Sequence, residues 1–205
     1  MNVHKFRNLD NTAIIILAAG NSTRFGSIKQ LLHFNGKTLL QHTIDEAVDA
    51  GAEPVLVITG DNADRISDSI EKNKVEIVFN KDWKKGMASG IVAGVSRTIT
   101  LNSDIDKIII AVCDQPFITS ELFKQLFRTQ SKSEKGIVAC AYADTIGTPV
   151  LFTQKYFEHL LNLQGDEGAK KLLKIYNQDV ATVDFPKGYI DIDTEADYQQ
   201  LLKEL

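Results

Sequence analysis

The feature that most constrains this chain is an unbroken apolar run, Ala13 to Ala19, that stops at Gly20. Apolar residues fill every position of the run, which is typical of a strand buried on both faces of a parallel sheet. A polar loop follows and contains two cations, Arg24 and Lys29. Because Gly20 has no Cβ, the loop backbone can approach a ligand closely, and its N–H groups and cations could hold a polyphosphate. An ordinary strand-to-helix turn with solvated cations is the other interpretation that this spacing leaves open.

Apolar and amphipathic segments alternate over the first part of the chain. The apolar segments predict strands at 13–19, 54–59, 75–79 and 107–112. The amphipathic segments predict helices at 38–51, 63–72 and 86–101, and another that begins at Thr119. This alternation predicts an α/β fold with a mostly parallel central sheet flanked by helices.

The second half of the chain mixes short strands with helices, which predicts antiparallel additions to the sheet. The strands are expected at 136–143, 148–152 and 180–184, and the helices at 156–163, 169–176 and from 194 onwards. Two helix starts carry a capping pattern, Thr38 with Gln41 and Thr194 with Asp197. Each pair can satisfy the free N–H groups of a first helical turn.

Composition limits the class of protein. The 205 residues are 43% hydrophobic and carry a formal net charge of −4 without a basic block. We therefore expect one domain, 1–205 with its core at about 12–202, rather than two small ones. The charge argues against a duplex nucleic-acid binder, which needs a basic stripe. The polar start and the shortness of the longest apolar run predict no membrane span and a cytoplasmic location.

Several common site types are excluded or disfavoured by pattern. Cys113 and Cys140 lie within predicted strands and away from any CxxC pattern, so we expect two small buried hydrophobic residues and no zinc site. The sequence lacks the P-loop pattern and the glycine fingerprint of dinucleotide-binding folds. The four histidines have no partners at ligand spacing, and we interpret them as non-catalytic.

Aspartates are the candidate metal ligands. Asp114 follows the strand at 107–112, and strand-end loops of a parallel sheet gather on one edge, so Asp114 should meet the loop that ends at Lys29. A carboxylate repels phosphates unless a cation lies between them, and Mg²⁺ is held by one or two carboxylates plus phosphate oxygens. Asp114 is thus the first candidate ligand, with an acidic turn residue as the alternative. Asp191 and Asp193 would share a face of an extended segment, and either could be the second ligand.

Asp166 and Glu167 stand at a predicted helix start between two glycines. They could bind a ligand or only favour the helix dipole, and the sequence leaves both interpretations open.

The segment from Leu17 to Lys29 resembles the signature loop of MobA-like nucleotidyltransferases, which usually reads LAAGxSxRMGxxK; Phe25 stands here in place of the Met. The Cys-Asp-Gln-Pro sequence at 113–116 is similar to a strand end typical of the molybdenum cofactor cytidylyltransferase branch. Further similar blocks lie at 86–94, 147–152, 165–169 and 191–194, so the resemblance spans about 12–200. Ile146, Lys170 and Glu195 depart from the pattern, where Arg, Arg and Pro are usual. These departures put the acceptor in doubt more than the reaction.

The resemblance implies a Rossmann-like, GT-A-type fold and Mg²⁺-dependent transfer of CMP from CTP to the phosphate of molybdopterin carrying molybdenum, with release of pyrophosphate. Arg24, Lys29 and Asp114 would be the catalytic residues, and Asp114 and Asp191 would bind Mg²⁺. The nucleotide would be bound by Leu17, Ala18, Ala19, Gly20, Ser22, Arg24, Lys29, Ser89 and Asp114. The acceptor would lie near Gln115, Thr148, Asp166 and Asp193. A molybdoenzyme that receives the finished cofactor is the implied protein partner.

Three alternatives stay open. The acceptor could be another phosphate, such as a sugar phosphate or methylerythritol phosphate. The base could be that of GTP or ATP, since the sequence does not reveal base preference directly. The chain could also carry molybdopterin without turnover. In the first two cases no strong general base is needed, because a phosphate monoester is largely ionised near neutrality, with a second pKa of about 6.

Overall fold

The computed structural model describes residues 9–20, 28–71 and 75–203. A seven-stranded sheet lies at its centre. In spatial order the strands are β5 (Glu76–Phe79), β4 (Val55–Thr59), β1 (Thr12–Leu17), β6 (Lys107–Val112), β8 (Thr145–Thr153), β7 (Ile137–Tyr142) and β9 (Val180–Asp184). Of these seven, only β8 runs against its neighbours. The predicted mostly parallel sheet with an antiparallel addition in the second half is confirmed.

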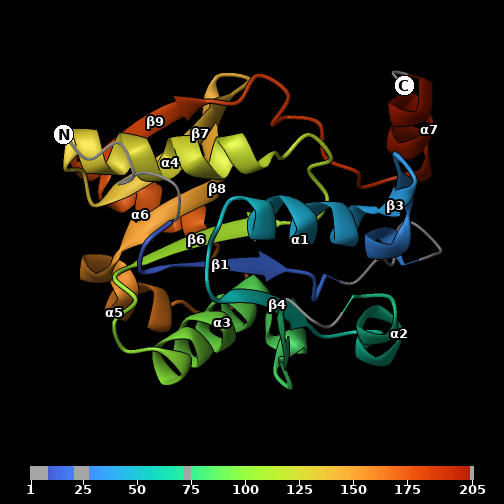
Figure 1. Cartoon of the computed structure of the whole chain (residues 1–205), viewed down its shortest axis with the longest axis horizontal. Coiled ribbons are helices and arrows are strands. Elements are labelled where there is room, and N and C mark those ends of the chain that lie inside the picture. The colour runs from blue at the N-terminus through green and yellow to red at the C-terminus, as the bar shows by residue number, and fades with distance from the viewer. Residues whose placement is uncertain (1–8, 21–27, 72–74, 204–205) are drawn as a thin grey trace.

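Helices cover both faces of the sheet (Figure 1). Their bounds are α1 (Leu39–Asp49), α2 (Ala63–Asp68), α3 (Met87–Leu101), α4 (Ser120–Ser133), α5 (Phe157–Leu161), α6 (Ala169–Ile175) and α7 (Glu195–Lys203). Short 3₁₀ turns are η1 (Lys29–Leu31), η3 (Trp83–Lys85), η4 (Gln154–Tyr156) and η5 (Asn177–Asp179). Helices α1 and α4 pack on one face, and α3, α5 and α6 pack on the other.

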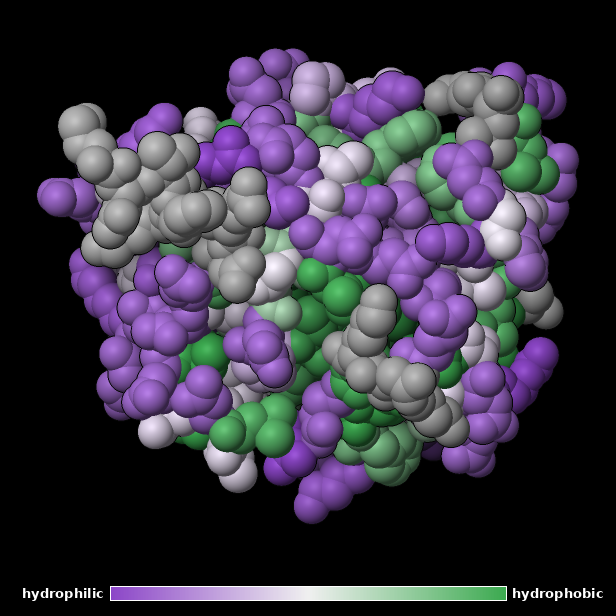
Figure 2. Space-filling model, in the orientation of Figure 1, coloured by the Kyte–Doolittle hydropathy of each residue, from purple (hydrophilic) through white to green (hydrophobic). Residues whose placement is uncertain are grey.

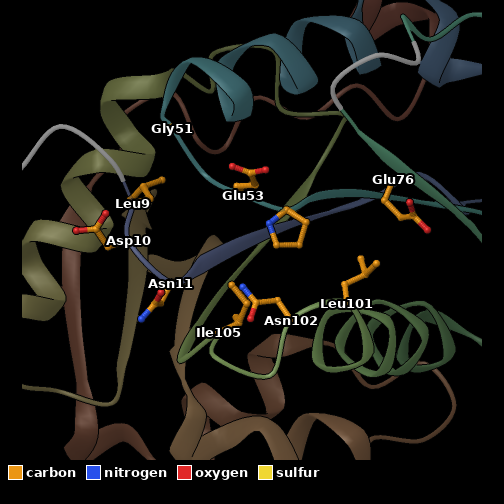
Figure 3. Close-up of a pocket in the computed structure, with 10 residues that line it drawn as sticks. Leu9, Asp10, Asn11, Gly51, Glu53, Glu76, Leu101, Asn102 and Ile105 are labelled. Carbon is orange, nitrogen blue, oxygen red and sulfur yellow. The ribbon is translucent and has the colours of Figure 1, made fainter.

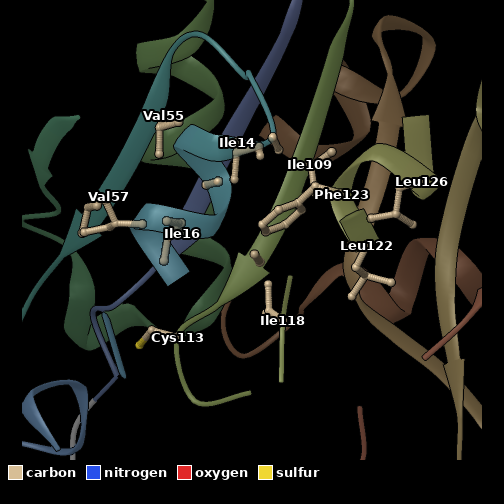
Figure 4. Close-up of a cluster of buried hydrophobic side chains, with 14 of the residues drawn as sticks. Ile14, Ile16, Val55, Val57, Ile109, Cys113, Ile118, Leu122, Phe123 and Leu126 are labelled. Carbon is tan, nitrogen blue, oxygen red and sulfur yellow. The ribbon is translucent and has the colours of Figure 1, made fainter. Parts of the chain in front are cut away.

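The apolar run of β1 contributes side chains to the hydrophobic cores on both faces of the sheet, because successive side chains of a strand point to opposite faces. Ile14 and Ile16 pack toward α1 and α4 in the cluster shown in Figure 4, whereas Ala13 and Ile15 pack toward α3. All four are fully buried. Strand β1 ends at Leu17, earlier than predicted, although the Ala18 N–H still donates to Ile58 O at 2.9 Å.

The predicted capping box forms completely at α7, whereas only one of its two hydrogen bonds forms at α1. At α7 the box closes both ways: the Thr194 N–H donates to Asp197 Oδ2 at 2.7 Å, and the Asp197 N–H donates to Thr194 Oγ1 at 3.3 Å. At α1 the Gln41 N–H donates to Thr38 Oγ1 at 3.0 Å, but the Gln41 side chain does not turn back. Its amide oxygen, the atom that a capping box would use, accepts from the Glu71 N–H at 3.2 Å, and its amide nitrogen donates to Asp45 Oδ1 at 2.8 Å.

Other segments also differ from the prediction. Strand β8 begins at Thr145, earlier than the predicted 148. Helix α2 ends at Asp68, short of the predicted 72, where the Ser69 hydroxyl donates to Ile66 O at 2.7 Å. A small hairpin, β2 (His33–Phe34) with β3 (Lys37–Thr38), precedes α1 and was not predicted. Its turn residues Asn35 and Gly36 both have positive φ, as a two-residue hairpin turn requires.

The hairpin anchors the last helix. Phe34 and Leu39 form a small core with Ile192 and Leu201, which ties α7 to this end of the molecule. The Ile192 N–H then donates to Asp114 O at 3.0 Å, so the segment before α7 runs beside the end of β6.

The face seen in Figure 2 is mostly hydrophilic, with apolar side chains gathered near its centre. Within residues 9–20, 28–71 and 75–203, no helix has the length and apolar character that crossing a bilayer would demand. Cys113 and Cys140 are buried as expected, and burial raises the pKa of each thiol to about 12.

Candidate active site

A cavity of about 690 Å³ opens at the edge of the sheet where β1 and β6 end. We call it the active-site cavity. Of the residues predicted for the site, it is lined by Leu17, Ala19, Gly20, Lys29, Asp114 and Asp166. Ala18 is buried behind this wall. Ser22 and Arg24 lie outside the described residues.

A second hollow, of about 550 Å³, lies at the opposite edge of the sheet (Figure 3). Three carboxylates stand on it, Asp10, Glu53 and Glu76, and its described lining contains no Lys or Arg. It would therefore repel a polyphosphate. The active-site cavity offers Lys29 and Lys84 and lies at the carboxyl edge, where open α/β sheets bind ligands.

Lys29 joins two carboxylates that are 85 and 164 residues away in sequence. Its Nζ donates to Asp114 Oδ2 at 2.7 Å and to Asp193 Oδ1 at 3.0 Å. Burial disfavours the charged ammonium, but the attraction and hydrogen bonds of Asp114 and Asp193 outweigh it, and the pKa of Lys29 is raised. Lys29 is thus charged at neutral pH and contacts Asp114, which its loop was expected to meet, and also Asp193, which was not expected there.

Asp191 adds a third carboxylate to this corner. It is exposed, as is Asp193, while Ile192 between them is buried. Burial of part of the carboxyl group raises the pKa of Asp191, and the charges of Asp193 and Asp114 raise it further. Such mutual repulsion is relieved when a cation binds.

The carboxylates of this corner could hold a divalent cation only together with other ligands. In the described part of the chain no group of three His, Cys, Asp or Glu side chains is arranged to hold a metal ion without help. Two carboxylates are enough for Mg²⁺ when phosphate oxygens and water complete the shell. Asp114 and Asp191 are the candidates for that role: burial raises the pKa of Asp191, and the charges of Asp193 and Asp114, which a cation would neutralise, raise it further.

Gln30 shapes the start of the loop that follows β1. It is buried, and its amide donates to Ala18 O at 3.0 Å and to Gly20 O at 3.1 Å. These bonds fix the carbonyls on either side of Ala19 at the cavity wall. Nothing in the sequence indicated that Gln30 would bind these two carbonyls.

The segment from Asn80 to the start of α3 forms another wall. It contributes Asn80, Trp83, Lys84 and Met87, which were not predicted as site residues. Trp83 packs on bare backbone: a Cβ placed at Gly60 would lie 2.6 Å from Trp83 Cβ. Lys84 Nζ lies 5.3 Å from the Trp83 ring centroid. The sequence feature that could have indicated this wall is the single tryptophan in a polar segment.

Ser89 braces this wall. Its hydroxyl donates to Gly86 O at 2.8 Å and accepts from Asn80 Nδ2 at 2.8 Å. The side chain stands on an adjoining hollow, behind the residues that line the active-site cavity. Its predicted place near the nucleoside stays a prediction.

Asp166 lies against the start of α3. The Ala88 N–H donates to Gly165 O at 3.1 Å, and a Cβ placed at Gly86 would lie 2.6 Å from Asp166 Oδ1. Gly86 has φ +105°, which also favours glycine there. Glu167 instead pairs with Lys171 at 2.6 Å, so only Asp166 of the two faces the cavity.

The remaining predicted residues, Gln115 and Thr148, lie on the other side of Asp114. Gln115 is buried and its amide donates to Gly188 O at 2.7 Å. Thr148 belongs to β8. Tyr142 at the end of β7 lies near both side chains: burial raises its pKa, and the polar groups of Thr148 and Gln115 act against that rise. Sequence patterns did not single out Tyr142.

Curated proteins and solved structures resemble this chain. Nicotine blue oxidoreductase of Paenarthrobacter nicotinovorans is 33% identical over 103 residues, 50% of this chain and 48% of that protein. A protein named "Probable molybdenum cofactor guanylyltransferase", of Bacillus cereus strain G9842, is 28% identical over 124 residues, 60% of this chain and 59% of that protein. The chain thus spans about half the length of these curated relatives.

The structure of Rv0371c from Mycobacterium tuberculosis H37Rv is 28% identical, with a TM-score of 0.82 over 94% of this chain and 97% of that one. Rv0371c has also been solved in complex with manganese, with a TM-score of 0.76 over 95% of this chain and 99% of that one. The model of the MobA-like NTP transferase domain matches residues 14–182, from β1 into β9. This match covers most of the sheet and the active-site cavity, and the chain belongs to the MobA-like NTP transferase family of nucleotidyltransferases.

Proposed function

We propose that this protein transfers CMP from CTP to the phosphate of a molybdopterin-type cofactor and releases pyrophosphate. The observation that carries the proposal is the corner of Lys29, Asp114 and Asp193, of which Lys29 and Asp114 line the active-site cavity. A half-buried ammonium beside carboxylates at the end of two parallel strands suits a ligand that brings both phosphates and a cation. The sequence resemblance adds the cytidylyl and molybdopterin assignments.

The chain's own residues would act by positioning and by balancing charge. Backbone N–H groups near Gly20 and the Lys29 ammonium would hold the triphosphate, together with Arg24 by motif position. Lys29 would then be shared between phosphate oxygens and the carboxylates that it contacts now. The acceptor's phosphate oxygen attacks the α-phosphorus, forming one P–O bond as the bond to pyrophosphate breaks. No residue need remove a proton, because the attacking phosphate is already ionised.

Asp114 and Asp191 would hold Mg²⁺. The bound cation would neutralise charge on the triphosphate and act as a Lewis acid. The manganese complex of Rv0371c supports a divalent cation in a relative, and the crowding of carboxylates around Asp191 supports one here.

GTP is the second candidate donor, favoured by the curated guanylyltransferase relative. We keep CTP first because the Cys-Asp-Gln-Pro segment at 113–116 is similar to that of the cytidylyl branch. A different phosphate acceptor, or a role as a carrier without turnover, remains the alternative to a molybdopterin transferase. A cytoplasmic location and delivery of the product to a molybdoenzyme complete the proposal, with no role in binding nucleic acid or membranes.

Pyrophosphate release tests the proposal. The full chain is incubated with molybdopterin carrying molybdenum, Mg²⁺ and CTP, GTP or ATP in parallel. We expect release with CTP to be fastest and to stop when Mg²⁺ is removed with a chelator. Trp83, the sole tryptophan, lines the cavity, so its fluorescence should report the binding of each nucleotide.

Each other outcome has a meaning. A preference for GTP would move the protein to the guanylyl reaction and leave the cavity assignment intact. Nucleotide binding without pyrophosphate release would favour the carrier. Release with a sugar phosphate in place of molybdopterin would keep the reaction and replace the acceptor.

A further inference from the structure

Tyr142 stands in a place that two glycines keep open. A Cβ at Gly188 would lie 2.5 Å from Tyr142 Cδ1, and a Cβ at Gly147 would overlap the Tyr142 hydroxyl. Phe185 packs edge-on against the ring, with centroids 6.2 Å apart. Side chains at either glycine would displace the ring, so the fold holds the phenol in one position at the carboxyl edge of the sheet.

The hydroxyl of Tyr142 lies near the buried amide of Gln115, which lacks one of its hydrogen bonds in the described part of the chain. Gln115 is 3% exposed, and its amide nitrogen is used by Gly188 O. Its amide oxygen is buried and has no hydrogen-bond partner among the described residues. A buried acceptor without a partner costs about 1–3 kcal/mol, and in native proteins it calls for a donor such as a bound water, since a phosphate dianion can only accept.

Lys170 brings a cation to the same place. Its Cε lies 3.3 Å from a Cβ placed at Gly147, beside the Tyr142 hydroxyl. Within residues 9–20, 28–71 and 75–203 it has no salt-bridge partner, whereas its neighbour Lys171 pairs with Glu167 at 2.6 Å. Thr148 in β8 adds a second hydroxyl next to Tyr142.

We propose that Lys170, Tyr142 and Thr148 form the subsite that binds the phosphate monoester of the acceptor. The proposal rests on the function proposed above and names the residues that receive the second substrate. One ammonium and two hydroxyl donors on neighbouring elements match the oxygens of a phosphate, and a charge-assisted bond from Lys170 supplies most of the affinity. Gln115 holds Tyr142 in place through its bond to Gly188, the glycine against which the ring packs.

The location separates this subsite from the nucleotide. None of Gln115, Tyr142, Thr148 and Lys170 lines the active-site cavity. Asp191 stands near both, because its charge acts on Tyr142 and is itself affected by Asp114. A phosphate on Lys170 and a triphosphate on Lys29 would thus both lie near the carboxylate corner.

Phenyl phosphate is the probe for the test, with phenol as the probe that lacks the phosphate. Calorimetric titrations use the full chain with Mg²⁺ and the α,β-methylene analogue of CTP, which cannot be cleaved. We expect Lys170→Gln to weaken phenyl phosphate about tenfold, the effect of losing one charge-assisted hydrogen bond. Tyr142→Phe should weaken it less, and Lys170→Arg should keep the affinity. Lys171→Gln is the matched control and should change nothing.

The affinity for the CTP analogue should be the same in all five proteins. Unchanged phenyl phosphate binding by Lys170→Gln would overturn the subsite, as would wild-type protein that binds phenol equally well. A loss of analogue binding in Lys170→Gln would instead place this lysine on the nucleotide and also overturn the subsite. Wild-type protein that fails to bind the analogue would refute the proposed function, and titration of the nucleotide-free protein would still test the subsite.

Discussion

At the scale of single residues, the carboxylate corner is a matter of charge balance. Lys29 faces Asp114 and Asp193 directly, and Asp191 stands near both carboxylates. One ammonium does not neutralise three carboxylates, so the corner keeps an excess negative charge. A divalent cation removes that excess, and a bare triphosphate would increase it.

Asp114→Asn tests this balance. Asn is nearly the same size and keeps an oxygen ligand, but it lacks the charge, so we expect the fold to survive and kcat/KM to fall roughly a hundredfold, about 3 kcal/mol. Asp191→Asn should cost less, because Asp191 lacks the direct contact with Lys29. Asp184→Asn, an exposed aspartate at the end of β9, is the control. The measurement is a Mg²⁺ titration of pyrophosphate release. An unchanged Mg²⁺ response in Asp114→Asn would reduce Asp114 to a turn residue.

At the scale of elements, α3 connects the cavity to the core. Its first turn, with Met87 and Gly90, lines the active-site cavity, and its later turns pack on β1 and β4. Gly94 allows that close approach: a Cβ there would lie 2.7 Å from Ile15 Cγ2. At Gly90 the nearest atom would be 3.5 Å away, an ordinary contact.

These two glycines give a matched pair of substitutions. Alanine gains up to about 1 kcal/mol over glycine within a helix. We expect Gly90→Ala to raise the free energy of unfolding by part of that amount. Gly94→Ala should lower it by about 1 kcal/mol, because displacing a β-branched core side chain costs about 1–3 kcal/mol and exceeds the helical gain. Urea unfolding measures both. Equal effects at the two positions would show that α3 does not depend on close contact at Gly94.

At the scale of the whole molecule, Asp179 connects segments at the edge opposite the active-site cavity. It accepts hydrogen bonds from Tyr156 Oη at 2.6 Å, Lys155 Nζ at 2.8 Å and the Gly136 N–H at 3.1 Å. These partners come from η4 and from the residue before β7, so one carboxylate links three segments. The bonds from Lys155 and Tyr156 lower the pKa of Asp179 to about 2.

The depressed pKa predicts how stability depends on pH. An aspartate whose pKa is lower in the folded state stabilises the fold above its unfolded pKa of about 3.9, and this contribution is lost as the pH falls toward about 2. We expect Asp179→Asn to lower the free energy of unfolding by about 1–2 kcal/mol at pH 7, with the carboxylate partly exposed to water. The difference from wild type should shrink below pH 4. Urea unfolding at pH 7, 4 and 3 checks it, with Glu121→Gln at the exposed pair with Arg128 as control. A difference that stays constant with pH would refute the role of the charge.

The sequence by itself determined the elements whose signals are local. The apolar runs of β1, β4 and β6 predict buried parallel strands because each residue there is buried whatever its direction. The box at Thr194 and Asp197 formed because both partners lie within one helical turn. The β2–β3 hairpin was missed although Asn35-Gly36 is a turn signal, because its strands are too short to show alternation. The placement of Asp114 at the carboxyl edge of the sheet followed from its position directly after an apolar strand.

Only the tertiary structure decided which side chains meet. Lys29 reaches Asp193 across 164 residues because Ile192 and Leu201 pack with Phe34 and carry the last segment back to β6. Tyr142 is held between Gly147 and Gly188. Nothing in the sequence links these three residues. Such meetings depend on how the sheet crossovers and small cores bring distant segments together. Local periodicity reports only whether a side chain is buried, so it leaves the identity of its distant neighbours undetermined.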